Sequence, residues 1–204
     1  MEVADLIGKV KIPQCHPLEL APFLRSVLYP VQNGIPGVMV EIGTNKGKSL
    51  ACLLQTLNLL GQRREVFCID PFDNAARFFP SRVEKFAGEI PAQLIRLSSQ
   101  DPEAVKRLKG SPIAWLLIDG CHCYDCVLAD IDRWIPEVIS GGTVVFHDFC
   151  PRFNYGKRDF CAAAGSKRRW GVWPAFKIAK AARALEQVEQ SPRRTPGMAV
   201  FMKV

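Results

Sequence analysis

The sequence predicts an α/β fold in which a parallel β-sheet is covered by helices on both faces. Five short apolar runs alternate with amphipathic segments of helical period, which is typical of such a sheet. The runs are almost continuously apolar, as strands buried on both faces are. Four of them end on glycine, aspartate or histidine, where sheets of this kind bind ligands. We predict strands over 38–42, 66–69, 94–97, 114–118 and 143–146.

The helices are predicted from local signals at their ends. A first helix is expected from Leu18 to Leu28, ending before Pro30, because proline cannot donate the next backbone hydrogen bond. Asp101 and Pro102 are residue types that suit an N-cap and a first helical position. The other helices are predicted over 48–60, 81–87, 101–108, 124–139 and 173–185.

The C-terminal part departs from the strand–helix alternation. Gly141 and Gly142 predict a tight return before the fifth strand. Residues 151–169 are expected to be irregular and are rich in basic side chains. Two strands, over 187–190 and 198–203, have no helix between them, so we predict an antiparallel hairpin at the edge of the sheet.

Length and composition indicate one domain with a single core. The chain has 204 residues, of which 48% are hydrophobic. We predict one domain over 1–204, with a helical lead-in over 1–30 and a variable substrate-side insertion over 151–173. No apolar run approaches the roughly 20 residues that span a bilayer, and the acidic N-terminus lacks the features of a secretory signal. We therefore expect a cytoplasmic protein without membrane contact, of open oligomeric state.

The net charge of +7 is concentrated in the C-terminal part. Residues 1–150 hold 15 Lys and Arg against 17 Asp and Glu, whereas residues 151–204 hold 12 against 3, a net of +9. This asymmetry indicates either an acidic substrate or partner near the C-terminal part, or a solvated basic surface.

The turn after the first strand offers a place for a ligand. Gly43 and Gly47 permit close approach of the backbone, and the helix that follows presents unpaired N–H groups. Asp70 ends the second strand, where a carboxylate can accept both hydroxyl groups of a ribose. A purely structural turn and a helix cap are the alternatives for these residues.

Two nucleotide-binding motifs are approached without being completed. Residues 43–49 are one residue short of the phosphate loop G-x-x-x-x-G-K-[ST], and Ile42 stands where its first glycine should be. The apolar strand that ends at Asp119 resembles the magnesium-binding strand of those enzymes. The dinucleotide motif G-x-G-x-x-G would need glycine in place of Asn45. A nucleotide triphosphatase therefore stays a minor alternative.

One further set of elements extends over most of the chain. It combines the glycine turn, the acid after the second strand, an Asp-Gly-x-His-x-Tyr element and a Gly-Gly…His-Asp element. Its members are Glu41, Gly43, Gly47, Ser49, Asp70, Ile118, Asp119, Gly120, His122, Tyr124, Asp130, Trp134, Pro136, Gly141, Gly142, His147 and Asp148. With this set the chain resembles class I S-adenosylmethionine-dependent methyltransferases. More narrowly, it resembles the small branch that includes macrolide-sugar O-methyltransferases and cephalosporin-hydroxylase-like proteins.

The resemblance implies a Rossmann-like, doubly wound sheet of seven strands in the order 3-2-1-4-5-7-6, with the last strand antiparallel. It also implies S-adenosylmethionine as cofactor and methyl transfer, for which we expect an oxygen acceptor. The implied cofactor-binding residues are Glu41, Gly43, Thr44, Gly47, Ser49, Asp70, Ser99 and Asp119. Among them, Asp70 would bind the ribose and Ser99 would lie near the adenine.

The candidates for catalysis are Asp119, His122 and His147. The sulfonium methyl group is already electrophilic, so such an enzyme mainly aligns the acceptor with it. A hydroxyl acceptor must also lose a proton, and histidine is the usual general base near neutral pH. Because some relatives bind a divalent metal here, magnesium or manganese is a further expectation at Asp119, His147 and Asp148.

The eight cysteines leave a second metal open. Four of them follow the fourth and fifth strands: Cys121, Cys123, Cys126 and Cys150. With His122 and His147 they could hold zinc, since Cys-x-x-Cys is a common half-site. Zinc ranks below magnesium or manganese as an expectation.

The acceptor is expected to be a small molecule or a glycan, anionic if the basic segment faces it. The basic side chains concerned are Lys157, Arg158, Lys167, Arg168 and Arg169. Trp170 and Trp173 would stack on a sugar or base, or pack in the core. A nucleic-acid methyltransferase ranks lower, because the chain has no separate nucleic-acid module. The alternatives from another class are a hydroxylase-like activity on this fold, or cofactor binding without transfer.

Overall fold

The computed structural model describes residues 2–10, 17–149, 158–161, 165–169, 171–191 and 197–204. The strands are β1 (Val38–Ile42), β2 (Val66–Ile69), β3 (Ala92–Ile95), β4 (Ile113–Ile118), β5 (Val138–Phe146), β6 (Arg158–Cys161), β7 (Ser166–Arg169), β8 (Leu185–Gln190) and β9 (Ala199–Lys203). The helices are α1 (Val3–Ile7), α2 (Pro17–Gln32), α3 (Lys48–Leu59), α4 (Asp73–Phe86), α5 (Pro102–Lys106), α6 (Tyr124–Trp134) and α8 (Val172–Ile178), with 3-10 helices η1 (Ile135–Glu137) and η3 (Ala181–Ala184).

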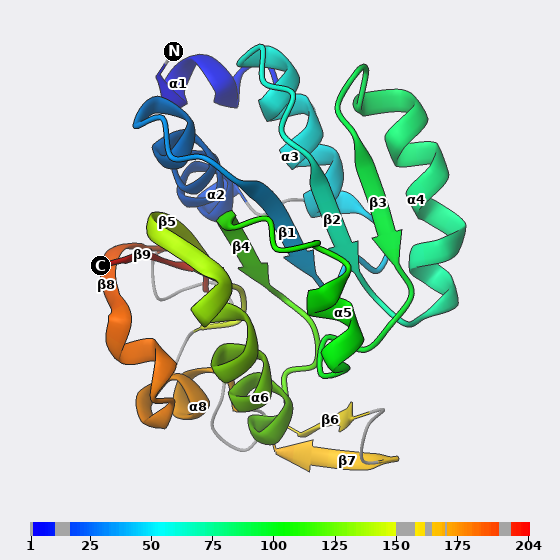
Figure 1. Cartoon of the computed structure of the whole chain (residues 1–204), viewed down its shortest axis with the longest axis vertical. Helices are drawn as coiled ribbons and strands as arrows, with labels where there is room; N and C mark the ends of the chain where they lie inside the picture. Colours follow the sequence, from blue (N-terminus) through cyan, green and yellow to red (C-terminus); the bar gives the residue numbers. More distant parts are fainter. Residues whose placement is uncertain (1, 11–16, 150–157, 162–164, 170, 192–196) are drawn as a thin grey trace.

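Seven of the strands form one sheet in the order β3-β2-β1-β4-β5-β9-β8 (Figure 1). The first five strands along the chain are parallel, and β9 pairs antiparallel with both β5 and β8. This confirms the predicted fold, its strand order and its antiparallel last strand. The remaining two strands, β6 and β7, form a separate hairpin at one end of the molecule (Figure 1).

Two apolar layers hold the sheet from its two faces. Strands β1 and β4 are buried along their whole length. Their side chains alternate between the layers, so Val40 belongs to one layer and Met39 to the other. One layer packs on α1, α2 and α3, and the other packs on α5, α6 and α8. The carboxyl ends of the central strands are left open between these helices, which is where the site lies.

The first long helix does not end where the sequence predicted. Helix α2 continues through Pro30 to Gln32. Proline at this position removes the helical donor to the carbonyl of Ser26. The hydroxyl of Thr143 in β5 donates to that carbonyl at 2.8 Å. A hydrogen bond from the sheet therefore replaces the helical one, which no local signal could indicate.

Other boundaries also differ from those predicted. Gly141 and Gly142 lie inside β5, where the register with β4 shifts, and form no return before the strand. Helix α6 accordingly stops at Trp134, and η1 follows it. Helix α4 begins at Asp73 and passes through Pro80. The segment predicted as irregular contains the β6–β7 hairpin, and the helix predicted over 173–185 ends at Ile178.

Candidate functional site

The first turn brings the ends of β1 and β4 into close contact. Gly43 follows β1 with a φ of 90°, which favours glycine. A Cβ at this position would lie 2.1 Å from the carbonyl oxygen of Asp119. Any side chain here would therefore push the two strand ends apart, and their separation is part of the site.

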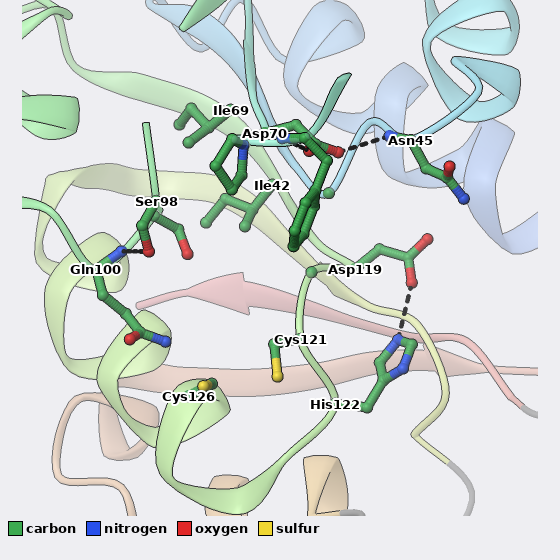
Figure 2. A pocket seen from close by; sticks show the side chains of 15 residues that line it. Ile42, Asn45, Ile69, Asp70, Ser98, Gln100, Asp119, Cys121, His122 and Cys126 are labelled. Atoms are coloured by element: carbon green, nitrogen blue, oxygen red, sulfur yellow. Dashed lines mark hydrogen bonds and ion pairs between the residues drawn. The ribbon is translucent and has the colours of Figure 1, made fainter. Parts of the chain in front are cut away.

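A cavity of about 440 Å³ opens beside this turn. Its walls come from the ends of β1, β2 and β4, from the loop after β3 and from the start of α6 (Figure 2). The lining residues are Ile42, Gly43, Asn45, Ile69, Asp70, Pro71, Phe72, Ser98, Ser99, Gln100, Asp119, Gly120, Cys121, His122 and Cys126. In addition to Gly43, four residues that were predicted to form the site line this cavity: Asp70, Ser99, Asp119 and His122.

Asp70 connects the second strand to the first turn. Its Oδ2 accepts a hydrogen bond from the backbone N–H of Asn45 at 2.7 Å, and its Oδ1 accepts one from Phe72 at 2.9 Å (Figure 2). The carboxylate is therefore fixed in orientation at the cavity wall. Each oxygen retains a further lone pair that can accept from a ligand hydroxyl.

Ser99 lines the cavity, but its hydroxyl is engaged with α6. It donates to Oδ1 of Asp130 at 2.6 Å, while Nε1 of Trp134 donates to the carbonyl of Ser99 at 2.9 Å. Burial raises the pKa of Asp130 to about 7, although the Ser99 bond and the charge of Arg133 lower it. Oδ2 of Asp130 is buried without a hydrogen-bond partner in the described part of the chain.

Four predicted cofactor residues lie outside the cavity wall: Glu41, Thr44, Gly47 and Ser49. Glu41 is fully buried, and burial raises its pKa to about 7, partly offset by the hydroxyls of Ser49 and Thr44. Gly47 is the left-handed residue that starts α3. Thr44 and Gly47 belong to the turn, and Glu41 and Ser49 lie on the strand and helix that it joins. Their contact with a cofactor stays a prediction.

A cluster of carboxylates and imidazoles continues the site beyond Asp119. We call it the carboxylate–imidazole cluster, and it comprises Glu19, Asp119, His122, His147 and Asp148. Nε2 of His122 lies 3.4 Å from Asp119 (Figure 2) and 3.1 Å from Asp148. Nδ1 of His147 lies 3.1 Å from Asp119 and 3.2 Å from Asp148.

Mutual charge determines the protonation of this cluster. Burial alone would raise the pKa of Asp119, but the charge of His147 and hydrogen bonds from both imidazoles lower it to about 2. Burial would lower the pKa of His147, but Asp119, Asp148 and Glu19 raise it well above its usual range. Burial would likewise lower the pKa of His122, but Asp119 and Asp148 raise it above its usual value. The imidazole of His147 therefore carries a proton at neutral pH in this state, and the same carboxylates favour the protonated form of His122.

Glu19 is a site residue that sequence reasoning missed. It lies in the first turn of α2, buried, with Oε2 at 3.5 Å from Nε2 of His147. Its Oε1 accepts a hydrogen bond from the backbone of Gly197 at 3.4 Å. Glu19 belongs to no recognisable motif, and only the packing of α2 on the sheet brings it to His147.

The cysteine expectations are only partly met by the described residues. Cys121, Cys123 and Cys126 gather with Cys161, the last residue of β6, and their thiol sulfurs lie within 4.8 Å of one another. The sequence offered no reason to include Cys161. Cys150, by contrast, lies outside the described residues.

The two histidines that were considered as zinc ligands, His122 and His147, contact the carboxylates.

The basic C-terminal segment is described only in part. The backbone of the hairpin pairs Arg158 with Arg169 and Asp159 with Arg168. Lys157 and Trp170 lie outside the described residues. Trp173, in α8, packs at the edge of the apolar layer on α6. The packed alternative is therefore the one observed for Trp173.

Comparison with known protein families shows to which family the chain belongs. The sequence profile of a family described as a methyltransferase domain matches residues 40–149, more than half of the chain. The chain belongs to this family of methyltransferase domains.

A relative from Sinorhizobium fredii (strain NBRC 101917 / NGR234), the uncharacterized protein y4gI, is 30% identical over 119 residues, or 55% of this chain. The chain spans only 13% of the length of that relative.

Solved methyltransferases share the fold. The N-methyltransferase NodS from Bradyrhizobium japonicum WM9 matches with a TM-score of 0.61 at 14% identity, over 92% of this chain and 97% of NodS. The CcbJ methyltransferase from Streptomyces caelestis matches with a TM-score of 0.62 at 11% identity, over 94% of this chain and 99% of CcbJ. MycE from the mycinamycin biosynthetic pathway, in complex with Mg, SAH and mycinamycin VI, matches with a TM-score of 0.60 at 15% identity, over 100% of this chain and 54% of MycE.

The sheet order and these likenesses together give a class I S-adenosylmethionine-dependent methyltransferase fold. Within the described part of the chain, no helix combines the length and apolar character needed to cross a membrane.

Proposed function

We propose that this chain binds S-adenosylmethionine in the cavity and transfers its methyl group to a hydroxyl oxygen of a small-molecule or glycan acceptor. The observation that carries the proposal is that the cavity and the carboxylate–imidazole cluster have two residues in common. Asp119 and His122 line the cavity and also belong to the carboxylate–imidazole cluster. A cofactor in the cavity would therefore lie next to groups that can hold or accept a proton. The family and the fold support methyl transfer as the class of reaction.

The cavity suits the cofactor in size and in chemistry. Ligand cavities commonly measure roughly 300–1,000 Å³, and this one measures about 440 Å³. Gly43 leaves the backbone open to close approach on one side. Asp70 offers fixed carboxylate oxygens to the ribose hydroxyls from the end of β2. Ser99, near which the adenine would lie, is bonded to Asp130. In the described part of the chain, Oδ2 of Asp130 is buried without a hydrogen-bond partner, so it is a polar group close to the proposed adenine region.

The donor set of the cluster fits a divalent cation of the magnesium or manganese type. Asp119, His122 and Asp148 each place one ligand atom within 4.8 Å of the others. Two carboxylates with one imidazole form a hard set that suits these ions. His147, the imidazole predicted from the sequence, also lies within 3.2 Å of both carboxylates. A cation held there would lower the pKa of a bound acceptor hydroxyl.

The protein's own groups would orient the acceptor and receive its proton. An imidazole accepts a proton only in its neutral form, so the base must first lose the proton that Asp119 and Asp148 stabilise. Asp119 contacts both imidazoles and would hold either of them toward the cavity. Where His122 does not itself bind the cation, we infer that it is the better placed base, because it alone of the two histidines lines the cavity.

The acceptor proposal rests on charge. Residues 151–204 carry a net charge of +9, and several of the basic residues that produce it belong to the β6–β7 hairpin. An acceptor with a phosphate or carboxylate group would be attracted to this side. That MycE was solved with a small-molecule ligand supports a small acceptor over nucleic acid. We also propose that residues 1–204 act as one catalytic domain, with 151–173 on the acceptor side.

Parallel calorimetric titrations with S-adenosylhomocysteine, ATP and NAD test the cofactor assignment. We expect micromolar binding of S-adenosylhomocysteine, about −8 kcal/mol, and no binding of the other two. Transfer is then followed with methyl-labelled S-adenosylmethionine and a panel of anionic and neutral hydroxyl compounds. Tight binding of ATP without S-adenosylhomocysteine would reverse the assignment in favour of a nucleotide triphosphatase.

A further inference from the structure

Four thiols from two distant segments meet beside the cavity. We call Cys121, Cys123, Cys126 and Cys161 the thiol cluster. The first three lie on the loop after β4 and in the first turn of α6, and Cys161 ends β6. Sγ of Cys161 lies 3.4 Å from that of Cys123 and 3.5 Å from that of Cys126. Three of the four side chains are almost completely buried, and Cys121 is partly so.

The spacing of the sulfurs matches one tetrahedral ion. Zinc binds thiolate sulfur at roughly 2.3 Å, which places neighbouring sulfurs of a tetrahedron about 3.8 Å apart. The four sulfurs here all lie within 4.8 Å of one another. An iron–sulfur cluster has several atoms between its cysteine sulfurs and would hold them farther apart. A disulfide joins sulfurs only in pairs, whereas all four sulfurs here lie close enough together to contact one ion.

We propose that the thiol cluster is a structural zinc site that fastens the β6–β7 hairpin to the loop between β4 and α6. Four protein thiolates close the coordination sphere, and closed tetrahedral sites are structural rather than catalytic. Soft sulfur ligands also select zinc over magnesium or manganese. The site is therefore distinct from the carboxylate–imidazole cluster in position, ligand type and role.

The architecture explains why such a fastening would be needed. An isolated two-stranded hairpin is marginally stable in water, and among the described strands β6 and β7 pair only with each other. The chain returns from the hairpin through Gly171, whose backbone N–H donates to the carbonyl of His122 at 2.8 Å. A Cβ on Gly171 would lie 2.5 Å from Cα of Tyr124, so the backbone is pressed against the same loop. Zinc at Cys161 would fasten the hairpin at its other end.

The fastening would also place the hairpin relative to the cavity. Cys121 and Cys126 belong to the thiol cluster and line the cavity wall. Zinc would therefore hold one wall of the cavity and the basic hairpin in a fixed relation. This gives the metal a defined effect on the acceptor side without a part in the chemistry.

The direct test is made on the full-length protein purified without chelator. Elemental analysis should find about one zinc per chain, and X-ray absorption at the zinc edge should show four sulfur neighbours at about 2.3 Å. Cobalt substituted for zinc should give the visible bands of a tetrahedral tetrathiolate. Oxygen or nitrogen neighbours in the absorption spectrum would overturn the proposal.

Two matched variants separate the site from general effects on folding. Cys161→Ser should weaken zinc binding by at least about 100-fold, more than the roughly 10–100-fold typical of an outer-shell partner. Cys52→Ser, a buried thiol on α3, should retain the full zinc content. Equal zinc in both variants would place the metal elsewhere and overturn the proposal.

Thiol counting gives a second measurement that does not depend on the variants. The denatured, chelated protein should show all eight thiols if the cluster binds metal. Two or four fewer thiols in protein without zinc would instead indicate disulfides and would overturn the proposal. Neither result depends on binding of S-adenosylhomocysteine, so this proposal and the proposed function fail separately.

Discussion

Two clusters with different chemistry share one short loop beside the cavity. The carboxylate–imidazole cluster takes Asp119 and His122 from this loop, and the thiol cluster takes Cys121 and Cys123 from it. Figure 2 shows His122 turned toward Asp119, while Cys121 lies on the side of Cys126. Successive residues of an extended segment point in opposite directions, so one loop can serve both clusters.

The difference between the clusters lies in what stabilises each one. Charges of opposite sign stabilise the carboxylate–imidazole cluster, in which the imidazoles lower the pKa of Asp119 to about 2. The thiol cluster consists of buried thiols, and burial raises the pKa of Cys121 to about 12. The carboxylate–imidazole cluster can exist without a metal, because its charges compensate one another. The thiol cluster gains most from a metal, because only thiolates bound to a cation would be charged there.

The largest expected effect is that of chelation. Brief treatment with a chelator should reduce methyl transfer to background, since the magnesium or manganese proposed for the carboxylate–imidazole cluster would be bound mainly through exchangeable carboxylate oxygens. Added magnesium or manganese should restore transfer, while zinc analysis of the same samples should show the thiol cluster still loaded. Full transfer in chelator would remove a metal from the mechanism and leave His122 or His147 as a simple general base.

Asp119→Asn should reduce transfer by about 10²–10³-fold, because an uncharged amide cannot form ion pairs with the two imidazoles that Asp119 contacts. Zinc content should stay that of the wild type. The measurement is single-turnover transfer together with elemental analysis. A variant that loses zinc and transfer together would show that the two clusters are not independent.

Asp130→Asn tests a second buried acid, which lies on α6 and belongs to neither cluster. The folded pKa of Asp130 is raised to about 7, against about 3.9 in an unfolded chain. Between these values the folded state retains a proton that the unfolded state has lost, so the wild type loses stability as pH rises through this window.

Relative to the variant, the wild type should lose roughly 2–4 kcal/mol of unfolding free energy between about pH 4 and 7. Chemical denaturation of both proteins across this range measures the difference. Parallel curves for the two proteins would mean that Asp130 is ionised throughout.

Asp70→Ala should weaken binding of S-adenosylhomocysteine by about 1–3 kcal/mol, because hydrogen bonds to a charged acceptor are lost. The loss of the Asn45 contact would loosen the first turn as well. Calorimetry measures the affinity, and Asp73→Ala, at an exposed acid on α4, is the control. Unchanged affinity would exclude Asp70 from the cofactor site and leave both clusters untouched.

The smallest expected effect concerns the basic hairpin. Replacing Lys167, Arg168 and Arg169 by Ser should lower transfer efficiency with an anionic acceptor by about 3–10-fold and flatten its salt dependence. Affinity for S-adenosylhomocysteine should not change. Unchanged turnover and salt dependence would mean that this segment is only a solvated surface. A steep log–log salt slope with DNA, near 0.9 per neutralised phosphate, would instead indicate nucleic acid.

The sequence by itself determined the architecture of this protein. Buried apolar runs that alternate with helices predict a parallel sheet with an antiparallel hairpin at its edge, and the resemblance to methyltransferases implied the strand order that is observed. The positions of Gly43, Asp70, Asp119 and His122 at strand ends were also readable, because the carboxyl ends of parallel strands meet at one edge. Patterns of this kind are local, and local signals survive in a single sequence.

Tertiary structure alone decided the contacts between distant segments. Pro30 stays inside α2 because Thr143, far along the chain, bonds the carbonyl that proline leaves free. Glu19 reaches His147 through the packing of α2 on the sheet. Cys161 completes the thiol cluster through the path of the β6–β7 hairpin. Hydrogen bonds, ion pairs and metal ligands need only proximity in space, which spacing along the chain does not encode.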